Sequence, residues 1–336
     1  MGNLPEPRVQ PFQPFQNCGI DFAGPIYVRT SLRRNAPTSK AYICLFICLS
    51  TKAIHIQLVE DLSTPSFLAS LKRFISRRGK PSTIFSDNAT NFVGAHNELK
   101  ELAELWKNQT HSESIISYLA SNEIDWKFIP PKSPNFGGMW ESSIKLVKNH
   151  LKRIVGNTKL TFSEYVTVLT QIEAYINSRP LFPLSSDPND LSVLTPAHFL
   201  TGSSLLDTPE TDIRHLPVNR LTRWQHVTQI CQHFWKRWTR EYLQELQGRN
   251  KWTTSRESIS PGTLVLVKDD QTPPLSWIIA RVERTYPGPD GKVRVADLRT
   301  KAGVLKRNIR SLCPLPVDDE DSLLKPTLQG GEHGKA

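Results

Sequence analysis

The chain has 336 residues, enough for two or three domains at roughly 150 residues per domain. Hydrophobic residues make up 38% and charged residues 22%, a balance that excludes a wholly disordered chain. The net charge of +10 favours an anionic partner, nucleic acid before membrane. The five cysteines form no CxxC pair, the longest apolar run (41–49) is too short to span a bilayer, and the N-terminus has no signal-peptide pattern. A secreted protein and a membrane protein are both disfavoured, and an intracellular chain is expected.

The first half of the chain predicts an α/β domain with a mixed sheet flanked by helices. Three strands with short links predict an antiparallel meander, and the third alternates so strictly that one face should be exposed. Ser63 is predicted to cap the first helix. Phe136 to Gly138 predict a glycine turn before the helix at 140–155. The predicted strands are 20–29, 41–50, 53–60, 82–86 and 125–129, and the predicted helices are 67–80, 95–106, 112–120, 140–155 and 161–179.

The second half predicts a helical connector and a small all-β barrel. A helix is expected over 221–247, followed by short strands at 263–268, 276–283, 292–298 and 304–306. From Arg214 to Arg310 there are 19 Lys or Arg and 8 Asp or Glu, a balance of +11, so this segment carries the whole net charge. The predicted boundaries are an extended lead-in (1–16), an α/β core (17–180), the connector (181–258), the barrel (259–316) and a disordered acidic tail (317–336).

Three acids stand at the ends of predicted elements of the core. Asp21 lies in a strand, Asp87 ends a strand, and Glu141 opens a helix after the glycine turn. Carboxylates that converge repel one another and need a counter-cation, and Mg²⁺ takes such oxygens while leaving positions open for phosphate. Two such ions about 3.5–4 Å apart would clamp the attacking and leaving oxygens of a phosphoryl transfer. The alternative is that each acid only forms a turn or favours a helix dipole.

The flanking residues of these acids resemble the catalytic core of retroviral and retrotransposon integrases, the DDE family with a ribonuclease H-like fold. Asp21 matches the first aspartate, Asp87 in the pattern DN-x-x-NF the second, and Glu141 the glutamate. The run IPPKSPNFGGMWE, the opening MGNLPEPRV and the region from TRWQHVTQ through PGTLVLVKDD and DGKVRV resemble most closely the BEL/Pao type. The resemblance covers about residues 1–316, with a core, a connector and an SH3-like barrel.

The resemblance implies an enzyme that processes retroelement DNA 3′ ends and joins them to target DNA by in-line transesterification. It implies two Mg²⁺ (or Mn²⁺) ions on Asp21, Asp87 and Glu141, and a homo-oligomer on DNA in the nucleus, or in a cytoplasmic particle before nuclear entry. The sequence departs from the family pattern in two ways. Between Asp87 and Glu141 lie 53 residues, more than in retroviral enzymes, and Ala89 stands where glycine is usual. The family's zinc-binding module does not precede Asp21, so we expect a polyprotein fragment without zinc.

Basic residues predict the contacts to DNA. Lys145, Lys148 and Lys152 share a helix face beyond Glu141, where the family has DNA-contacting lysines; solvated helix charge is the alternative. Asn91 either orients DNA or forms a turn. The barrel residues Lys292, Arg294 and Arg307, with Arg299, Lys301, Lys306 and Arg310, resemble a basic DNA-binding face, against the alternative of a merely soluble surface.

Several aromatic, histidine and cysteine residues of the chain are expected to be structural. Trp235 and Trp238 are expected to pack their helix rather than stack on bases, and His55 is expected to be a strand residue rather than a ligand. His226, Cys231 and His233 lack a second ligand pair and are not expected to bind zinc.

Two other functions compete with the integrase reading. A retrotransposon-derived chain that keeps the fold could act only as a DNA- or chromatin-binding protein; the intact acids disfavour this and the missing zinc module favours it. A ribonuclease H-like nuclease would need a fourth acid in the cluster, and no convincing candidate stands near Asp125.

Overall fold

The structure is a computed structural model that describes residues 12–33, 35–87, 92–97, 124–128, 134–156, 158–185, 187–206, 208, 210–248 and 259–316. Of residues 134–144 only the backbone is described. The chain forms two compact units, each assembled from separate stretches. The first unit comprises Met1–Arg179, Thr195–Glu241 and Asp270–Ser276, and the second comprises Pro180–Leu194, Tyr242–Asp269 and Trp277–Ala336. The domain boundaries predicted from the sequence stay a prediction.

The first unit is built on a five-stranded mixed sheet. Its strands lie in the order β3-β2-β1-β4-β5. The first three pair antiparallel as the predicted meander, β4 pairs parallel with β1, and β5 pairs parallel with β4. The strands are β1 (Asn17–Arg29), β2 (Thr38–Cys48), β3 (Ile54–Val59), β4 (Thr83–Ser86) and β5 (Asp125–Phe128). The predicted class, an α/β core with a mixed sheet flanked by helices, is confirmed.

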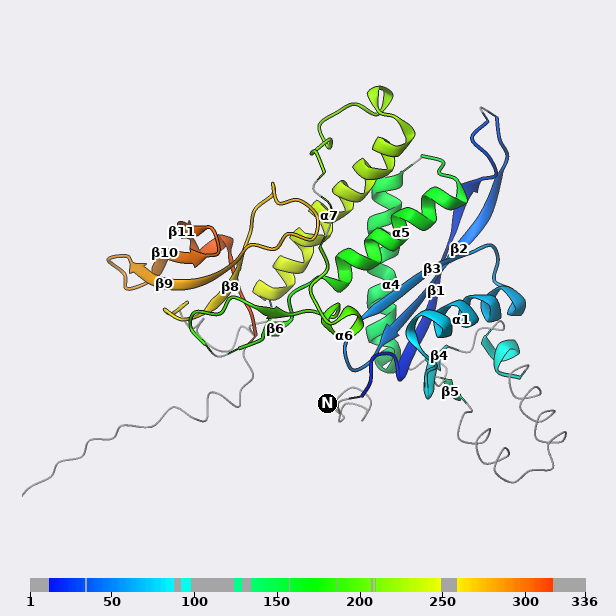
Figure 1. Cartoon of the computed structure of the whole chain (residues 1–336), viewed down its shortest axis with the longest axis horizontal. Helices are drawn as coiled ribbons and strands as arrows, with labels where there is room; N and C mark the ends of the chain where they lie inside the picture. The colour runs from blue at the N-terminus through cyan, green and yellow to red at the C-terminus, as the bar shows by residue number, and fades with distance from the viewer. Residues whose placement is uncertain are drawn as a thin grey trace, which may run out of the picture. The chain divides into compact units, whose positions relative to one another are not determined.

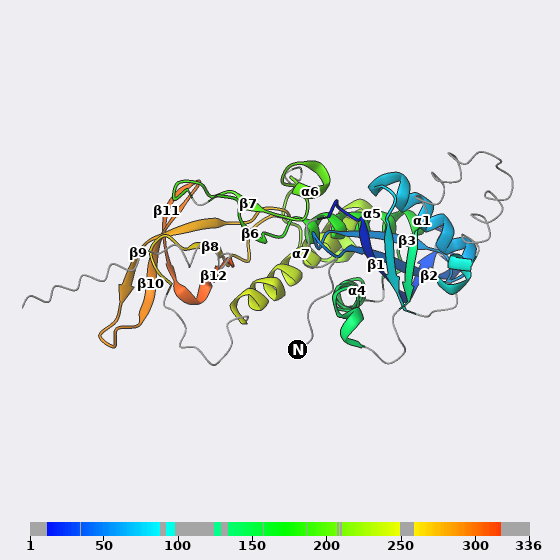
Figure 2. The same cartoon turned by 90° about the horizontal axis from the view of Figure 1, so that it is seen from below.

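The helices of this unit cover both faces of the sheet, and Figure 2 shows the strands between α1 and α4. Ser63 caps α1 as predicted, since its hydroxyl accepts from the Ser66 amide at 3.3 Å. Thr161 and Glu164 form a capping box at the start of α5. The helices are α1 (Thr64–Arg78), α4 (Pro134–Val155), α5 (Phe162–Asn177), α6 (His198–Thr201) and α7 (Arg223–Gly248), which ends in the second unit.

Two local predictions were wrong. The glycine turn at 136–138 is absent because α4 already begins at Pro134, a residue suited to the first helical position. Each glycine inside the helix costs only about 1 kcal/mol, which tertiary packing can offset. The strand predicted over 53–60 has no exposed face, because α1 and α5 both pack against β3 and bury all six of its residues. Of the predicted helix 95–106 the structure describes only residues 95–97, which belong to a helical stretch at 92–97. The predicted helix 112–120 lies outside the described residues.

An aromatic cluster fills the space between the sheet and α1. Phe46 stacks on Phe74 with ring centroids 4.2 Å apart, and Phe67 meets Phe92 edge to face at 5.1 Å. Phe15 is also buried here and contacts Phe74, so the packed core begins before β1. Burial of such rings is the largest hydrophobic contribution available to a core of this size.

The second unit contains a five-stranded antiparallel sheet in the order β11-β10-β9-β8-β12. This agrees with the small SH3-like barrel predicted, although β12 was not foreseen. The connector also contains a two-stranded hairpin of β6 and β7 that the sequence did not reveal. The strands are β6 (Phe182–Pro183), β7 (Val193–Leu194), β8 (Leu264–Val267), β9 (Ile279–Pro287), β10 (Val293–Thr300), β11 (Gly303–Asn308) and β12 (Leu312–Pro314).

In α7 the predicted packing role of the tryptophans is confirmed, since Trp235 and Trp238 are almost fully buried. Within the ranges that the structure describes, no helix is both long and apolar enough to cross a membrane.

Candidate active site

The parallel pairing of β1 with β4 brings Asp21 and Asp87 to the same level. Asn17, Cys18 and Gly19 lie opposite Thr83, Ile84 and Phe85. The same offset of 66 residues, continued two residues past the end of pairing, sets Asp21 opposite Asp87. Neighbouring strands lie about 4.8 Å apart, so the extended register gives the two aspartates adjacent positions at this end of the strand pair.

Strand alternation places both carboxylates on the α4 side of the sheet. Ile20 and Ile84 belong to the core cluster beneath α1. Side chains one residue further along a strand point to the opposite face, and Asp21 and Asp87 lie one and three residues beyond these two. Because α4 packs against β1 and β2, this face is the one that meets the helix carrying Glu141.

The two aspartates differ in their surroundings. Asp21 is half-buried, and its Oδ1 accepts from the Phe22 amide at 2.7 Å. Asp87 is exposed at the end of β4. Its backbone is held by Ser86, whose hydroxyl donates to the Asp87 carbonyl at 2.9 Å and accepts from Trp126 Nε1 at 2.9 Å. The negative charge of Asp21 also reaches Cys44, where burial first and this carboxylate second raise the pKa of the thiol to about 12.

Glu141 belongs to α4 as predicted, but its side chain lies outside what the structure describes. Helical periodicity puts positions 141, 145, 148 and 152 on one side of α4. Lys145, Lys148 and Lys152 are all exposed there, while Val147 and Leu151 bury the neighbouring side. The structure therefore aligns the predicted lysines along the helix from position 141. Asn91 lies outside the described residues.

The donor set suits a hard divalent cation. Two carboxylates at one level of adjacent strands, with a third expected from Glu141, offer the oxygen ligands that Mg²⁺ prefers. Among the described side chains no group of three or more His, Cys, Asp and Glu is arranged to hold a metal. The complete triad therefore stays a prediction.

One basic residue near this site was missed from the sequence. Lys127 lies opposite Phe85 in the β4–β5 pair, on the same face as Asp87, and its Nζ is 5.8 Å from the Phe85 ring centroid. Alternation in the DWKF strand could have placed it there. Asp125 is on this face too, but it lies level with Thr83, four residues or about 13 Å from the level of Asp87, and its carboxylate is 3.3 Å from Lys127. Asp125 is therefore not a fourth acid of the cluster formed by Asp21, Asp87 and the expected Glu141.

The predicted basic residues of the barrel are exposed, except for the half-buried Arg299, and they are not equally available. Arg294 donates to the Asp290 carboxylate at 2.8 Å, which offsets its charge. Arg307 is exposed on β11, and Lys292 is exposed in the turn before β10. Lys306 lies 4.4 Å above the Tyr286 ring and 3.7 Å from Asp297. Arg299 donates to the Asn189 side-chain oxygen at 2.7 Å and to the Pro188 carbonyl. Its guanidinium therefore binds the connector loop.

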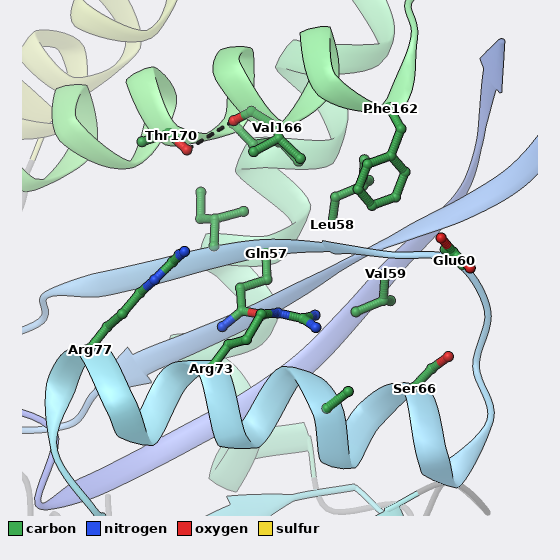
Figure 3. A pocket seen from close by; sticks show the side chains of 13 residues that line it. Gln57, Leu58, Val59, Glu60, Ser66, Arg73, Arg77, Phe162, Val166 and Thr170 are labelled. Atoms are coloured by element: carbon green, nitrogen blue, oxygen red, sulfur yellow. Dashed lines mark hydrogen bonds between the residues drawn. The ribbon is translucent and has the colours of Figure 1, made fainter. Parts of the chain in front are cut away.

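A groove of about 440 Å³ lies on another part of the first unit, between α1, α5 and β3 (Figure 3). Its lining includes Arg73 and Arg77 from α1 and Phe162 and Val166 from α5. Arg73 Nε donates to the Gln57 amide oxygen at 2.8 Å. Because β3 is the sheet edge farther from β4, the groove is separate from Asp21 and Asp87, and it is not the candidate active site.

Comparisons with known proteins give one matching family model and similarities to solved structures, two of which follow. Residues 222–315 match a family of unknown function (DUF5641). No curated protein matches the chain. A chain of the simian T-cell lymphotropic virus intasome in complex with PP2A regulatory subunit B56 gamma is 12% identical with a TM-score of 0.38, over 95% of this chain and 85% of that one. The HTLV-2 integrase catalytic core domain in complex with magnesium (trimeric form) is 13% identical with a TM-score of 0.34, over 57% of this chain and 99% of that one.

Proposed function

We propose that this chain is a metal-dependent polynucleotidyl transferase of the integrase type. It would process the 3′ ends of retroelement DNA and join them to target DNA by in-line transesterification. The observation that carries the proposal is the alignment of Asp21 with Asp87 on adjacent parallel strands, facing the helix that contains Glu141. The DN-x-x-NF pattern supports the integrase family, and the IPPKSPNFGGMWE run supports a BEL/Pao-type retrotransposon origin.

The proposed roles follow from the placement of each group. Asp21, Asp87 and Glu141 would hold two Mg²⁺ or Mn²⁺ ions, which supply Lewis-acid activation of a water or 3′ hydroxyl and of the phosphodiester. Lys145, Lys148 and Lys152 would bind phosphates along α4, and Lys127 would add a cation beside Asp87. The basic barrel would bind DNA without reading its sequence, so binding should weaken with salt. A homo-oligomer on DNA and a nuclear location complete the proposal.

The test is a strand-transfer assay on Asp87→Asn in Mg²⁺ and in Mn²⁺. Loss of one metal-binding oxygen charge should abolish joining while DNA binding stays within about twofold of the wild type, because Asp87 is exposed and its backbone is held by Ser86. Asp125→Asn is the control for loss of an exposed acid on the same sheet face. Because it also removes the ion pair of Lys127, DNA binding is measured alongside, and joining should stay intact. If Asp87→Asn still joins DNA ends, the assignment is wrong. If the wild type binds DNA but never joins ends, the chain is a binding protein instead.

A further inference from the structure

The hairpin formed by β1 and β2 runs on past the sheet as a two-stranded arm (Figure 1). We define the arm as residues 26–33 and 35–40. Its two strands pair with each other from Ile26–Ala41 to Arg29–Thr38. In contrast, β3 ends at Val59 opposite Tyr42, and β4 pairs with β1 only as far as Gly19. The arm therefore has no strand neighbour on the β3 side.

A bulge separates the arm from the sheet. The β1–β2 register shifts between Ala23 and Ile26. A Cβ at Gly24 would come within 2.5 Å of the Tyr42 ring, so the close approach of the two strands requires glycine at this position. Bulges of this kind bend and twist a hairpin, which re-aims the side chains beyond them.

The charge of the arm is entirely positive. From residue 26 to residue 40 the sequence contains four Lys or Arg and no Asp or Glu. Arg33 and Lys40 are exposed, and Tyr27 is 54% exposed directly opposite Lys40 on the same face. No described carboxylate forms an ion pair with either cation. A surface of this kind combines phosphate-binding charge with an aromatic ring.

Hydrogen bonds also support the backbone of the arm. The Arg29 amide donates to the Leu160 carbonyl at 2.8 Å, and its guanidinium donates to the Arg33 carbonyl. The Thr30 amide donates to the Pro37 carbonyl at 3.1 Å across the loop. Such bonds support the backbone that carries Arg33, which lowers the backbone entropy lost on binding.

We propose that this arm is a second DNA-binding site, in which Arg33 and Lys40 bind phosphates of duplex DNA and Tyr27 packs on the sugar-phosphate backbone. Tyr27 is six residues from Asp21 on the same strand, or about 20 Å. The arm would therefore bind the duplex away from the reacting phosphate. This inference rests on the proposed function only for the identity of the DNA, because its charge and exposure are independent of the acids.

The experiment measures duplex DNA binding of the full chain between 50 and 200 mM salt (about a fourfold range). Arg33→Gln/Lys40→Gln should reduce the slope of log affinity against log salt by about 2, and Tyr27→Ala should weaken binding several-fold at fixed salt. Lys72→Gln/Arg77→Gln, on exposed positions of α1, is the control with the same loss of net charge and should keep the slope within about 0.5 units of its wild-type value. Circular dichroism checks that each variant is folded.

The outcomes separate this inference from the proposed function. If the arm variant keeps the wild-type slope, or if the α1 control loses as much as the arm variant, the arm is not a DNA site. If the slope changes as expected while the wild type joins no DNA ends, the arm is a DNA site and the enzymatic proposal fails. If joining by the arm variant is impaired at low DNA concentration and recovers at saturating DNA, the arm serves binding alone, as proposed.

Discussion

Glu173 of α5 is a buried carboxylate whose removal should strongly destabilise the first unit. Its carboxylate is buried and accepts from the Ile56 amide at 2.7 Å, from His55 Nδ1 and from Arg78. The Ile56 amide lies on the outer edge of β3, where no further strand can bind it. Glu173 thus takes the place of a neighbouring strand for this edge.

The cost of Glu173→Ala follows from the groups left behind. The Ile56 amide and His55 are both buried, and each unsatisfied donor costs about 1–3 kcal/mol. The Arg78 side chain is 22% exposed and can be partly rehydrated, so it adds less than a fully buried charge. We expect the free energy of unfolding to fall by about 3–5 kcal/mol. Glu173→Gln keeps an oxygen acceptor for the Ile56 amide and should cost about 1–2 kcal/mol.

The pH dependence gives a second measure of the same carboxylate. Burial raises the pKa of Glu173, but the bonds from His55, from the Ile56 amide and from Arg78 outweigh it and hold the pKa below its ordinary value. A lowered folded-state pKa gives stability that is present above the unfolded value, about 4.3, and is lost as the pH falls through the folded value. The stability difference between wild type and Glu173→Gln should therefore be smaller at pH 4 than at pH 7.

The assay is denaturant unfolding followed by circular dichroism, with hydrogen exchange of the Ile56 amide as a local probe. Thr170→Ala on the same helix is the control, because its hydroxyl donates only to the Val166 carbonyl and should change stability by less than about 0.5 kcal/mol. A Glu173→Ala protein within about 1 kcal/mol of the wild type at pH 7 would show that the edge amide does not depend on this carboxylate.

Two further predictions concern buried titratable groups. The Glu241 carboxylate, 2.7 Å from Nε2 of His150, raises the pKa of this histidine, but burial lowers it by more, so the pKa lies below its ordinary value. The free energy of unfolding of the wild type, measured with denaturant, should therefore fall between pH 7.5 and pH 5, and that of His150→Gln should fall less. Equal changes with pH in the two proteins would contradict this. Burial raises the pKa of Cys44 to about 12 and of Cys313 to about 11, and all five cysteines are buried. Iodoacetamide at pH 8 should therefore label the cysteines slowly in the native protein and fully in denaturant, which mass spectrometry can measure.

The sequence predicted elements more reliably than it predicted their environment. Alternation over Ile54 to Val59 identified β3 correctly, but the exposed face it implied is covered by helices. The groups that complete this edge, Glu173 and Asn177, lie more than a hundred residues away, where Asn177 donates to the Ile54 carbonyl at 2.8 Å and accepts from its amide at 2.9 Å. Such distant polar pairings have no local signal, because the pattern of one segment does not encode its neighbour.

The glycine turn before Glu141 shows a different limit of local reasoning. Gly137 and Gly138 weaken a helix by propensity, yet α4 includes both because it begins at Pro134 and packs against β1 and β2. The acids themselves were found through their flanking residues, whereas the alignment of Asp21 with Asp87 needed the parallel register of two strands. Register depends on contacts between segments and cannot be read from either strand alone.

The long segment between Asp87 and Glu141 therefore bears less on the candidate site than its length suggests. The alignment of Asp21 with Asp87 follows from the pairing of residues 17–19 with 83–85, all of which precede that segment. The position of α4 depends on its own packing against β1 and β2, through residues that follow it. Because a longer connection adds little closure cost, about 0.6 kcal/mol for each doubling, extra residues can be inserted here without moving either partner. The 53-residue spacing is thus compatible with a three-carboxylate site whose geometry is determined by the sheet and α4.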